Sequence, residues 1–459
     1  MRRGFSRRAF LGRSIASSAG FSLTGTSLMQ LGAAAHAQSA GGYRALVCIL
    51  LAGGADSFNM LVPTDDDGYG EYAGIRSDLA LARETLAALA GTHQGGRTFG
   101  LHEALAPLAP LFDEGELAWV VNAGSLVEPT TPQAVQAGTA RLPLGLYSHA
   151  DQIEQWQTSL ADARSGVGVG GRIADLLGDV NPTSPISMNV STSGTNVFQS
   201  GAVSREFSID PREGGAPSAA GYARGDEGSP IIRPAVNAIL AESRRNLLRG
   251  AYGARFAEAL AAGEAFNAAL ASPPSFTTAF AEDPFSQQLR LIANVIASRD
   301  ALAVNRQTFF VTYGGWDHHD GLIENQARML PAVAAGLTAF RDAMVQLGTH
   351  GDVTTFTISD FGRTLTSNGR GSDHGWGGNQ LVLGGSVAGG ALYGEFPELA
   401  QDAPLDTGRG RFIPTLSVDE FYADLALWFG LAPSDLSMVI PNIGRFYTPG
   451  GAPPIGFMS

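Results

Sequence analysis

The 459-residue sequence contains a single cysteine, Cys48, so no disulfide can form within the chain. Cys48 lies inside an apolar run that is typical of a β-strand. Stability must therefore come from sources other than disulfides, such as a large core or a bound metal. With 44% apolar residues the chain can bury a substantial core, and its length suits one large α/β domain or two ordinary ones.

Positive charge is scarce. The sequence has 30 Lys and Arg residues against 43 Asp and Glu residues, a formal net charge of −13. Removal of residues 1–37 deletes five Arg and no acid, so that −13 becomes −18 for the remaining chain. Nucleic acids and anionic membrane surfaces demand clustered Lys and Arg, so this balance argues against both as partners.

The chain also lacks an apolar run that is strong enough to span a membrane. Ser14 to Leu31 is diluted by Ser, Gly and Thr, which excludes a stable spanning helix. Before it stands Ser6-Arg-Arg-Ala-Phe-Leu11, a twin-arginine export signature, and after it Ala35-His-Ala37, a small-x-small cleavage site. Residues 1–37 therefore predict a signal cleaved after Ala37, recognised by the twin-arginine export machinery and leading to the periplasm or cell surface. The alternative is an arginine-rich amphipathic helix.

Short β-rich runs alternate with helical patterns along the rest of the chain. The strand-like runs are Ala45 to Leu51, Leu117 to Asn122, Thr308 to Tyr313, Val353 to Ile358 and Gln380 to Leu383. The helical patterns include Pro284 to Val304, Ile323 to Leu347 and Asp419 to Phe429. This alternation predicts an α/β fold, with a largely parallel sheet covered by helices on both faces.

One stretch departs from this alternation. Residues 181–229 are rich in Ser, Gly, Pro and Thr with little periodicity, and an Ala- and Glu-rich helical segment follows at Ala235 to Ala271. We therefore expect residues 181–280 to form an irregular insertion or cap within a single domain that covers residues 38–459.

Polar clusters follow the strand-like runs. In an open α/β sheet the ligand site lies at the carboxyl ends of the strands, so these clusters are expected to converge. Four of the seven histidines beyond residue 37 fall within them. The clusters are Gly53 to Asn59, Tyr147 to Gln152, Gly314 to Asp320, and Ser359 to Thr364 with Ser372 to Gly378 just beyond.

Asp317 and His319 are two residues apart. In an extended segment their side chains point to the same face and are able to coordinate one cation, while the side chain of His318 points away from it. His374 adds a second imidazole from a neighbouring loop. An Asp-His-His set with an open position suits zinc or manganese. The alternative is a hydrogen-bonded loop that binds no metal.

Three further residues have two interpretations each. Ser148 precedes a helical run and is either an N-cap or a nucleophile in the positive field of a helix N-terminus. Arg363 either binds an oxyanion with two hydrogen bonds or pairs with a nearby carboxylate. Asp56 is either a metal ligand or a turn residue.

Two other polar features favour structural roles. His102 precedes a helical pattern and is interpreted as a capping or packing residue. The sequence Asp65-Asp-Asp-Gly68 resembles part of a calcium loop, but no glutamate follows at the required spacing, so we expect a solvated turn.

Taken together, the motifs resemble the bacterial family of unknown function DUF1501. The quoted forms are Leu51-Ala-Gly-Gly-Ala-Asp-Ser-Phe-Asn59, Tyr147-Ser-His149, Gly314-Gly-Trp-Asp-His-His319, Ser359-Asp-Phe-Gly-Arg-Thr364 and Asp373-His-Gly-Trp376. The likeness extends over nearly the whole chain after the signal. It implies a branch of the alkaline phosphatase and sulfatase superfamily, with one or two divalent metals at the carboxyl edge of the sheet.

The resemblance also implies roles for individual positions. Asp56 matches the metal aspartate after the first strand, Ser148 the nucleophile, Asp317, His319 and His374 the ligands of one metal, and Asp360 a ligand of the other. Where the superfamily usually has Asp-His-Gly, this chain has Asp360-Phe-Gly362, so the second site lacks its imidazole unless His149 or Asp373 replaces it. One divalent metal is therefore expected. Zinc or manganese is favoured, and calcium or magnesium is the alternative. The supporting candidates are Asn59, His149, His318 and Asp373.

Two functions remain open. The first is a hydrolase of phosphate or sulfate esters, small or polymer-borne, with Ser148 as nucleophile and Arg363 neutralising charge. The second is a catalytically degenerate module for binding or assembly in the cell envelope, beside an envelope protein partner. The missing imidazole favours the second function. The retained ionisable groups favour the first, because burying such groups costs several kcal/mol unless they are paired or ligated.

Overall fold

The computed structural model describes residues 42–223, 227–242, 247–272, 275–448 and 450–459, so the predicted export signal with Ala37 lies outside the described residues. A nine-stranded sheet runs through the molecule in the order β11-β5-β10-β9-β1-β8-β6-β7, with β12 beside β5. The strands are β1 (Arg44–Ala52), β5 (Leu117–Gly124), β6 (Asn189–Ser191), β7 (Phe207–Ser208), β8 (Arg306–Gly314), β9 (Val353–Ser359), β10 (Gly378–Leu383), β11 (Leu392–Tyr393) and β12 (Leu416–Ser417).

Most strand pairs in this sheet are parallel. β1 runs parallel to β8 and β9, and β8, β6 and β7 continue in the same direction. Only β10 is antiparallel to its neighbours β9 and β5. The prediction of a largely parallel sheet is confirmed, and the five predicted strands correspond to β1, β5, β8, β9 and β10.

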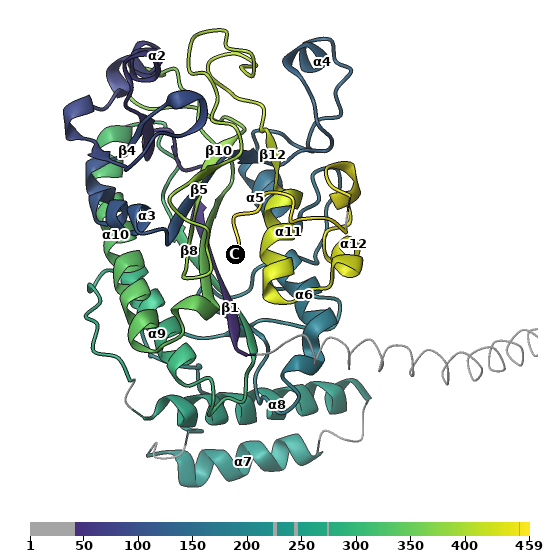
Figure 1. The fold of residues 1–459 in the computed structure, drawn as a ribbon. Helices are drawn as coiled ribbons and strands as arrows, with labels where there is room; N and C mark the ends of the chain where they lie inside the picture. The colour runs from purple at the N-terminus through teal and green to yellow at the C-terminus, as the bar shows by residue number, and fades with distance from the viewer. Residues whose placement is uncertain (1–41, 224–226, 243–246, 273–274, 449) are drawn as a thin grey trace, which may run out of the picture.

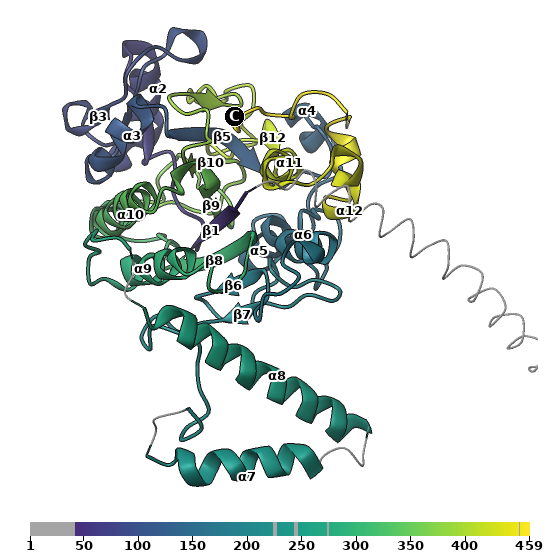
Figure 2. The ribbon, with the colours of Figure 1, turned by 60° about the horizontal axis from the view of Figure 1, so that its bottom comes forward.

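Helices cover both faces of the sheet (Figures 1 and 2). Along β1, the odd-numbered residues from Ala45 to Leu51 pack in one core cluster with α9 (Pro284–Ala297) and α10 (Leu322–Gln346). The even-numbered residues from Leu46 to Leu50 pack in the other cluster, with α6 (Val169–Leu177) and α11 (Val418–Phe429). This alternation is the consequence of side chains pointing to opposite faces of a strand, and it makes β1 the centre of both core layers.

Shorter elements surround the sheet. They are β2 (Leu61–Pro63), β3 (Ala87–Ala88) and β4 (Phe99–Leu101) of a second sheet, the helices α2 (Asp66–Arg76), α3 (Ala109–Asp113), α4 (Pro132–Gln136), α5 (His149–Thr158) and α12 (Leu436–Val439), and 3₁₀ turns at Ser77–Leu79, Arg83–Thr85, Gln94–Gly96, Glu103–Leu108, Gly178–Val180, His350–Asp352, Pro433–Asp435 and Ile443–Arg445.

The structure settles two of the structural interpretations. The imidazole of His102 accepts a hydrogen bond from the backbone of Ala104 at 3.0 Å, which confirms its capping role. The solvated turn predicted at Asp65 is wrong. Its carboxylate accepts from the backbone N–H of Gly68 at 2.8 Å and so caps the start of α2, because acidic residues suit the positive end of a helix.

The stretch predicted as an insertion or cap has two parts. β6 and β7 extend the central sheet, whereas α7 (Ser229–Glu242) and α8 (Leu247–Leu270) lie side by side away from it, as both ribbon views show (Figures 1 and 2). An ion pair between Arg233 and Glu264 joins the two helices. Within the described residues, no helix is both long and apolar enough to cross a bilayer.

Asp419, in the first turn of α11, generates a prediction about stability. Burial raises its pKa from an ordinary 3.8 to about 7. Between these values the folded protein retains a proton that the unfolded chain releases, so stability falls as the pH rises through this window and stays low above it. Asp419→Asn removes the ionisation. At pH 8 we expect the substitution to increase the free energy of unfolding by up to about a few kcal/mol and so to raise the melting temperature. Near pH 4 we expect little effect.

Thermal unfolding at pH 4, 6 and 8 measures this dependence. The exposed Asp78 supplies the matched control, because Asp78→Asn removes a charge that is already solvated. A gain from Asp419→Asn that is the same at pH 4 and pH 8 would contradict the assignment of the effect to ionisation.

Candidate metal centre

The loops after β1, β8 and β9 meet at the carboxyl edge of the sheet. Gly53, at a φ of +123°, passes so close to the loop after β8 that a Cβ there would lie 2.5 Å from the backbone nitrogen of Asp317. Gly54, at a φ of +75°, leaves no space for a Cβ beside the ring of Phe361, whose nearest carbon would be 2.3 Å away. Glycine is therefore required at both positions, and this close approach sets the place of Asp317.

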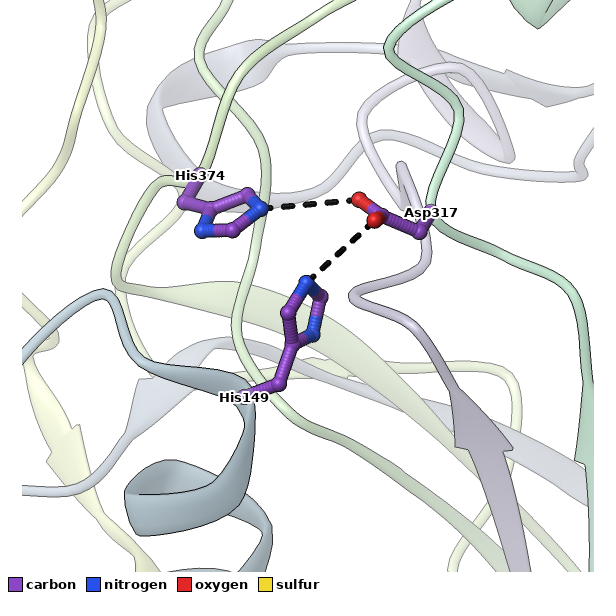
Figure 3. Close-up of side chains that lie close together, drawn as sticks. All are labelled: His149, Asp317 and His374. Atoms are coloured by element: carbon purple, nitrogen blue, oxygen red, sulfur yellow. Dashed lines mark ion pairs between the residues drawn. The ribbon is translucent and has the colours of Figure 1, made fainter.

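Three side chains converge above these loops: His149 from the start of α5, Asp317 after β8 and His374 after β9. Figure 3 shows the two imidazoles aimed at the two carboxylate oxygens. The Nε2 of His149 lies 3.4 Å from Oδ2 of Asp317, and the Nε2 of His374 lies 3.5 Å from Oδ1. One donor atom of each residue lies within 4.8 Å of the other two, as binding of a single cation requires.

The other ring nitrogen of each imidazole is held by an oxygen. Nδ1 of His149 lies 2.6 Å from Oδ2 of Asp360, and Nδ1 of His374 lies 2.7 Å from the carbonyl oxygen of Tyr147. Carboxylate and carbonyl oxygens accept hydrogen bonds, so each Nδ1 is the protonated donor. In the neutral rings both Nε2 lone pairs then face Asp317, the arrangement that metal-binding histidines adopt.

The backbone of Tyr147 contributes to this arrangement. Its φ of 72° lies in the left-handed region, which is unfavourable for a residue with a Cβ. The carbonyl oxygen of this strained residue is the one that accepts from Nδ1 of His374. We interpret the strain as the local cost of orienting that imidazole.

His319 lies at the exposed side of the three-donor group. Its Nε2 is 2.9 Å from Nε2 of His374 and 3.1 Å from Oδ1 of Asp317, and its Nδ1 is 3.0 Å from Oδ1 of Asp373. With both Nδ1 atoms protonated, the neutral rings of His319 and His374 would oppose two lone pairs at this short distance. A proton or a metal cation between them removes the repulsion, so the geometry calls for positive charge at this point.

The electrostatics of the cluster favour deprotonated ligands. Burial alone would raise the pKa of Asp317, but the hydrogen bond and charge of Arg363 outweigh it and hold the pKa below its ordinary value. Burial lowers the pKa of His374, against the hydrogen bond to Tyr147. For Asp373 burial is again outweighed, here by Asn368, Arg409 and His319, and the pKa falls to about 2. At neutral pH these groups are available as ligands or orienting acceptors.

Arg363 has a structural role in this cluster. The buried guanidinium donates to the backbone carbonyls of Gly54 at 2.7 Å and Ser372 at 2.8 Å, and its second Nη donates to Gly53 at 2.6 Å, to Trp316 and to the carboxylate of Asp317. Its donors are thus committed to the protein. Of the two interpretations from sequence, the structure supports carboxylate pairing.

Asp56, Asn59 and His318 lie outside the three-donor group. Asp56 forms a buried ion pair with Arg76, with 2.6 Å between Oδ2 and Nη2. Asn59 donates to a backbone carbonyl and accepts from Tyr72. The ring of His318 is buried against Trp316, with ring centroids 5.8 Å apart, and burial lowers its pKa. The charge of Asp56 is therefore balanced by Arg76 and not by a metal ion.

Ser148 occupies the N-cap position of α5, directly before His149. Its side chain makes no capping bond to the helix backbone and instead hydrogen-bonds with the side chain of Asp151. The hydrogen bond from Arg164 and then that from Ser148 lower the pKa of Asp151, which is ionised at neutral pH. The hydroxyl of Ser148 is therefore oriented by a carboxylate.

His149 is expected from the sequence as a supporting residue, whereas in the structure it belongs to the donor group itself. The available signal was its position at the start of a helix after a strand. Phe361, which cannot ligate a metal, packs its ring 4.8 Å from that of His149 and 4.5 Å from that of His374. The ring of Phe361 is thus an apolar packing surface for both imidazoles.

The fold and this cluster define an α/β protein with a candidate metal centre at the carboxyl edge of its sheet. Residues 244–438 match the model of a family described as "Protein of unknown function (DUF1501)", which confirms the resemblance for this part of the chain. The match includes the motifs around Asp317, Asp360 and His374. The motifs at Leu51–Asn59 and Tyr147–His149 precede it. No curated protein matches the sequence.

Two solved structures show distant similarity to the chain. The crystal structure of Ps i-CgsB is 11% identical, with 88% of this chain and 76% of that chain covered and a TM-score of 0.34. The crystal structure of Ps i-CgsB in complex with k-i-k-neocarrahexaose is 10% identical, with 86% and 74% covered and a TM-score of 0.33.

The close approach of Gly53 to Asp317 yields a testable prediction. Gly53→Ala adds a Cβ where none fits and forces an unfavourable φ, so we expect it to lower the free energy of unfolding by about 1–3 kcal/mol. Gly314→Ala is the matched control, because Gly314 is the last residue of β8, beside the site, but has no atom within 4 Å of an added Cβ. Urea unfolding of both variants measures the difference, and equal stability losses would contradict it.

Proposed function

We propose that this chain is an exported hydrolase of phosphate or sulfate esters that works with one divalent cation, zinc or manganese. The observation that carries the proposal is the convergence of two imidazoles on one carboxylate, each with its second nitrogen held by an oxygen. The motif resemblance to alkaline phosphatases and sulfatases supports the same class of reaction but stays a prediction.

The residues fit a metal of this kind. Two nitrogen donors and one carboxylate suit zinc or manganese, whereas calcium and magnesium prefer oxygen donors alone. The Nε2 of His149 is buried and has no hydrogen-bond partner among the described residues, as expected for an atom reserved for a ligand. His149, Asp317 and His374 would hold the cation, with His319 beside the position left open.

A bound divalent cation would polarise the ester oxygen and lower the pKa of the attacking group. The protein's own residues would supply positioning. Asp360 and the carbonyl of Tyr147 orient the imidazoles, and Arg363 fixes Asp317. The hydroxyl of Ser148, oriented by Asp151, is the proposed nucleophile. It would form an ester with the transferred group, the alcohol would leave, and water would then release the group.

A specific observation favours the second candidate function, a degenerate module for binding or assembly in the cell envelope. The ion pair with Arg76 neutralises Asp56, and the ring of Phe361 takes the place of a second-site imidazole. Metal binding at one site does not by itself require turnover, so the presence of metal and the presence of turnover need separate tests.

Metal content tests the donor group. We expect the purified protein to hold about one zinc or manganese per chain, and His149→Gln combined with His374→Gln to lose most of it, because two of three donors are removed. His93→Gln, a histidine far from the cluster in sequence and packed against Phe99, is the control and should retain the metal. Mass spectrometry of the metal gives the measurement. Equal metal in wild type and the double variant would remove the basis of the proposal.

Turnover of aryl phosphate and aryl sulfate esters tests Ser148. If Ser148 is the nucleophile, Ser148→Ala should lower kcat by a factor of 100 or more while metal content stays unchanged. Turnover that survives the substitution would reassign the attack to water. A metal-loaded wild type that hydrolyses none of these esters would favour the envelope module instead.

A further inference from the structure

Beside the proposed divalent metal, an anionic ester at this site would be bound more tightly by a second cation, supplied by the protein. The sequence contains no lysine, so all 30 of its Lys and Arg residues are arginines. Arg363, the arginine nearest the donor group, has its guanidinium committed to four backbone carbonyls and Asp317. An arginine that binds the substrate must therefore be one other than Arg363.

Arg411 contacts residues of the donor group and keeps part of its guanidinium available for a ligand. Its Nε donates to the backbone carbonyl of His374 at 2.9 Å, and its guanidinium stacks over the ring of Tyr147, 5.1 Å from the ring centroid. Both contacts are with residues that build the metal centre, since His374 is a donor and Tyr147 holds its Nδ1. Among the described residues, neither Nη of Arg411 has a hydrogen-bond or ion-pair partner.

The loop that carries Arg411 is fixed. The carboxylate of Asp406 accepts from the backbone N–H of Arg411 at 3.1 Å, and both the N–H and the hydroxyl of Thr407 donate to the carbonyl of Arg411. Phe412, the next residue, is buried and bridges back to Asp406. The guanidinium is thus presented on a rigid support, half-buried and with its Nη groups unpaired, as an anion site requires.

The neighbouring arginines do not offer a guanidinium with unpaired Nη groups. Arg409 pairs with Asp373, with 2.6 Å between Nη1 and Oδ2, and Asp373 in turn orients His319. Arg370 is largely exposed and pairs with Asp320 at 2.8 Å. Each already has a carboxylate partner.

We propose that Arg411 is the specificity-determining cation of the site and binds the non-bridging oxygens of a tetrahedral oxyanion, phosphate or sulfate. This inference rests on the proposed function and deepens it. The planar guanidinium offers two Nη groups in a geometry that matches two oxygens of such an anion. Neutral esters and carboxylate esters lack this pair of oxygens, so the site selects against them.

Calorimetric titration of inorganic phosphate and inorganic sulfate into the metal-loaded full chain tests the proposal. Arg411→Ala should weaken anion binding about 10- to 100-fold, because a charge-assisted contact is lost. Arg411→Lys should give an intermediate loss, since an ammonium keeps the charge but not the two-pronged geometry. Arg370→Ala is the matched control and should bind within about twofold of wild type, as expected for an exposed, solvent-screened ion pair.

Metal content is measured in every variant. Arg411→Ala that binds phosphate and sulfate as tightly as wild type would overturn the proposal. So would Arg411→Ala that loses the metal, because Arg411 would then position the donors and not the anion. A wild type that binds either anion through Arg411 but hydrolyses no ester would uphold this inference and contradict the proposed function, so the two failures are distinguishable.

Discussion

The carboxylate of Asp317 faces the buried guanidinium of Arg363 on one side and the imidazoles of His149, His319 and His374 on the other. Arg363 also donates to the backbone after β1 and to the carbonyl of Ser372, so one side chain joins the loops that carry the donor group. Because its guanidinium is buried, these contacts compensate its desolvation, and loss of the carboxylate of Asp317 would leave the buried charge without an ion-pair partner. The position of the donor group depends on this arginine.

The same arrangement explains how positive charge is distributed along this edge of the sheet. Arg76 neutralises Asp56 in the interior, and Arg363 partly neutralises Asp317. The imidazoles of His149 and His374 remain without a cation of their own, held by Asp360 and Tyr147 in the tautomer that suits ligation. The donor group of His149, Asp317 and His374 is thus the place where the proposed divalent cation would bind.

The amino-acid sequence was sufficient to predict β1, β5, β8, β9 and β10, because each is a short apolar run that ends in a polar cluster, but it did not predict β6, β7, β11 and β12, which are only two or three residues long. It was also sufficient to bring Asp317, His319 and His374 to one edge, because parallel strands end together. It could not decide the role of Arg363, since pairing depends on carbonyls far away in the chain. Nor could it foresee the left-handed Tyr147 or the direct part of His149, because both depend on how α5 approaches β9 in three dimensions. At Asp65 a local pattern was misread, since a helix cap and a turn use the same residue types.

The most direct test of the central claim is X-ray absorption spectroscopy at the metal edge of the purified, metal-loaded protein. The ligand shell of the metal should contain at least two imidazole nitrogens and a carboxylate oxygen, and His149→Gln should lose one imidazole contribution. A shell made of oxygens alone, or one unchanged by that substitution, would contradict this claim.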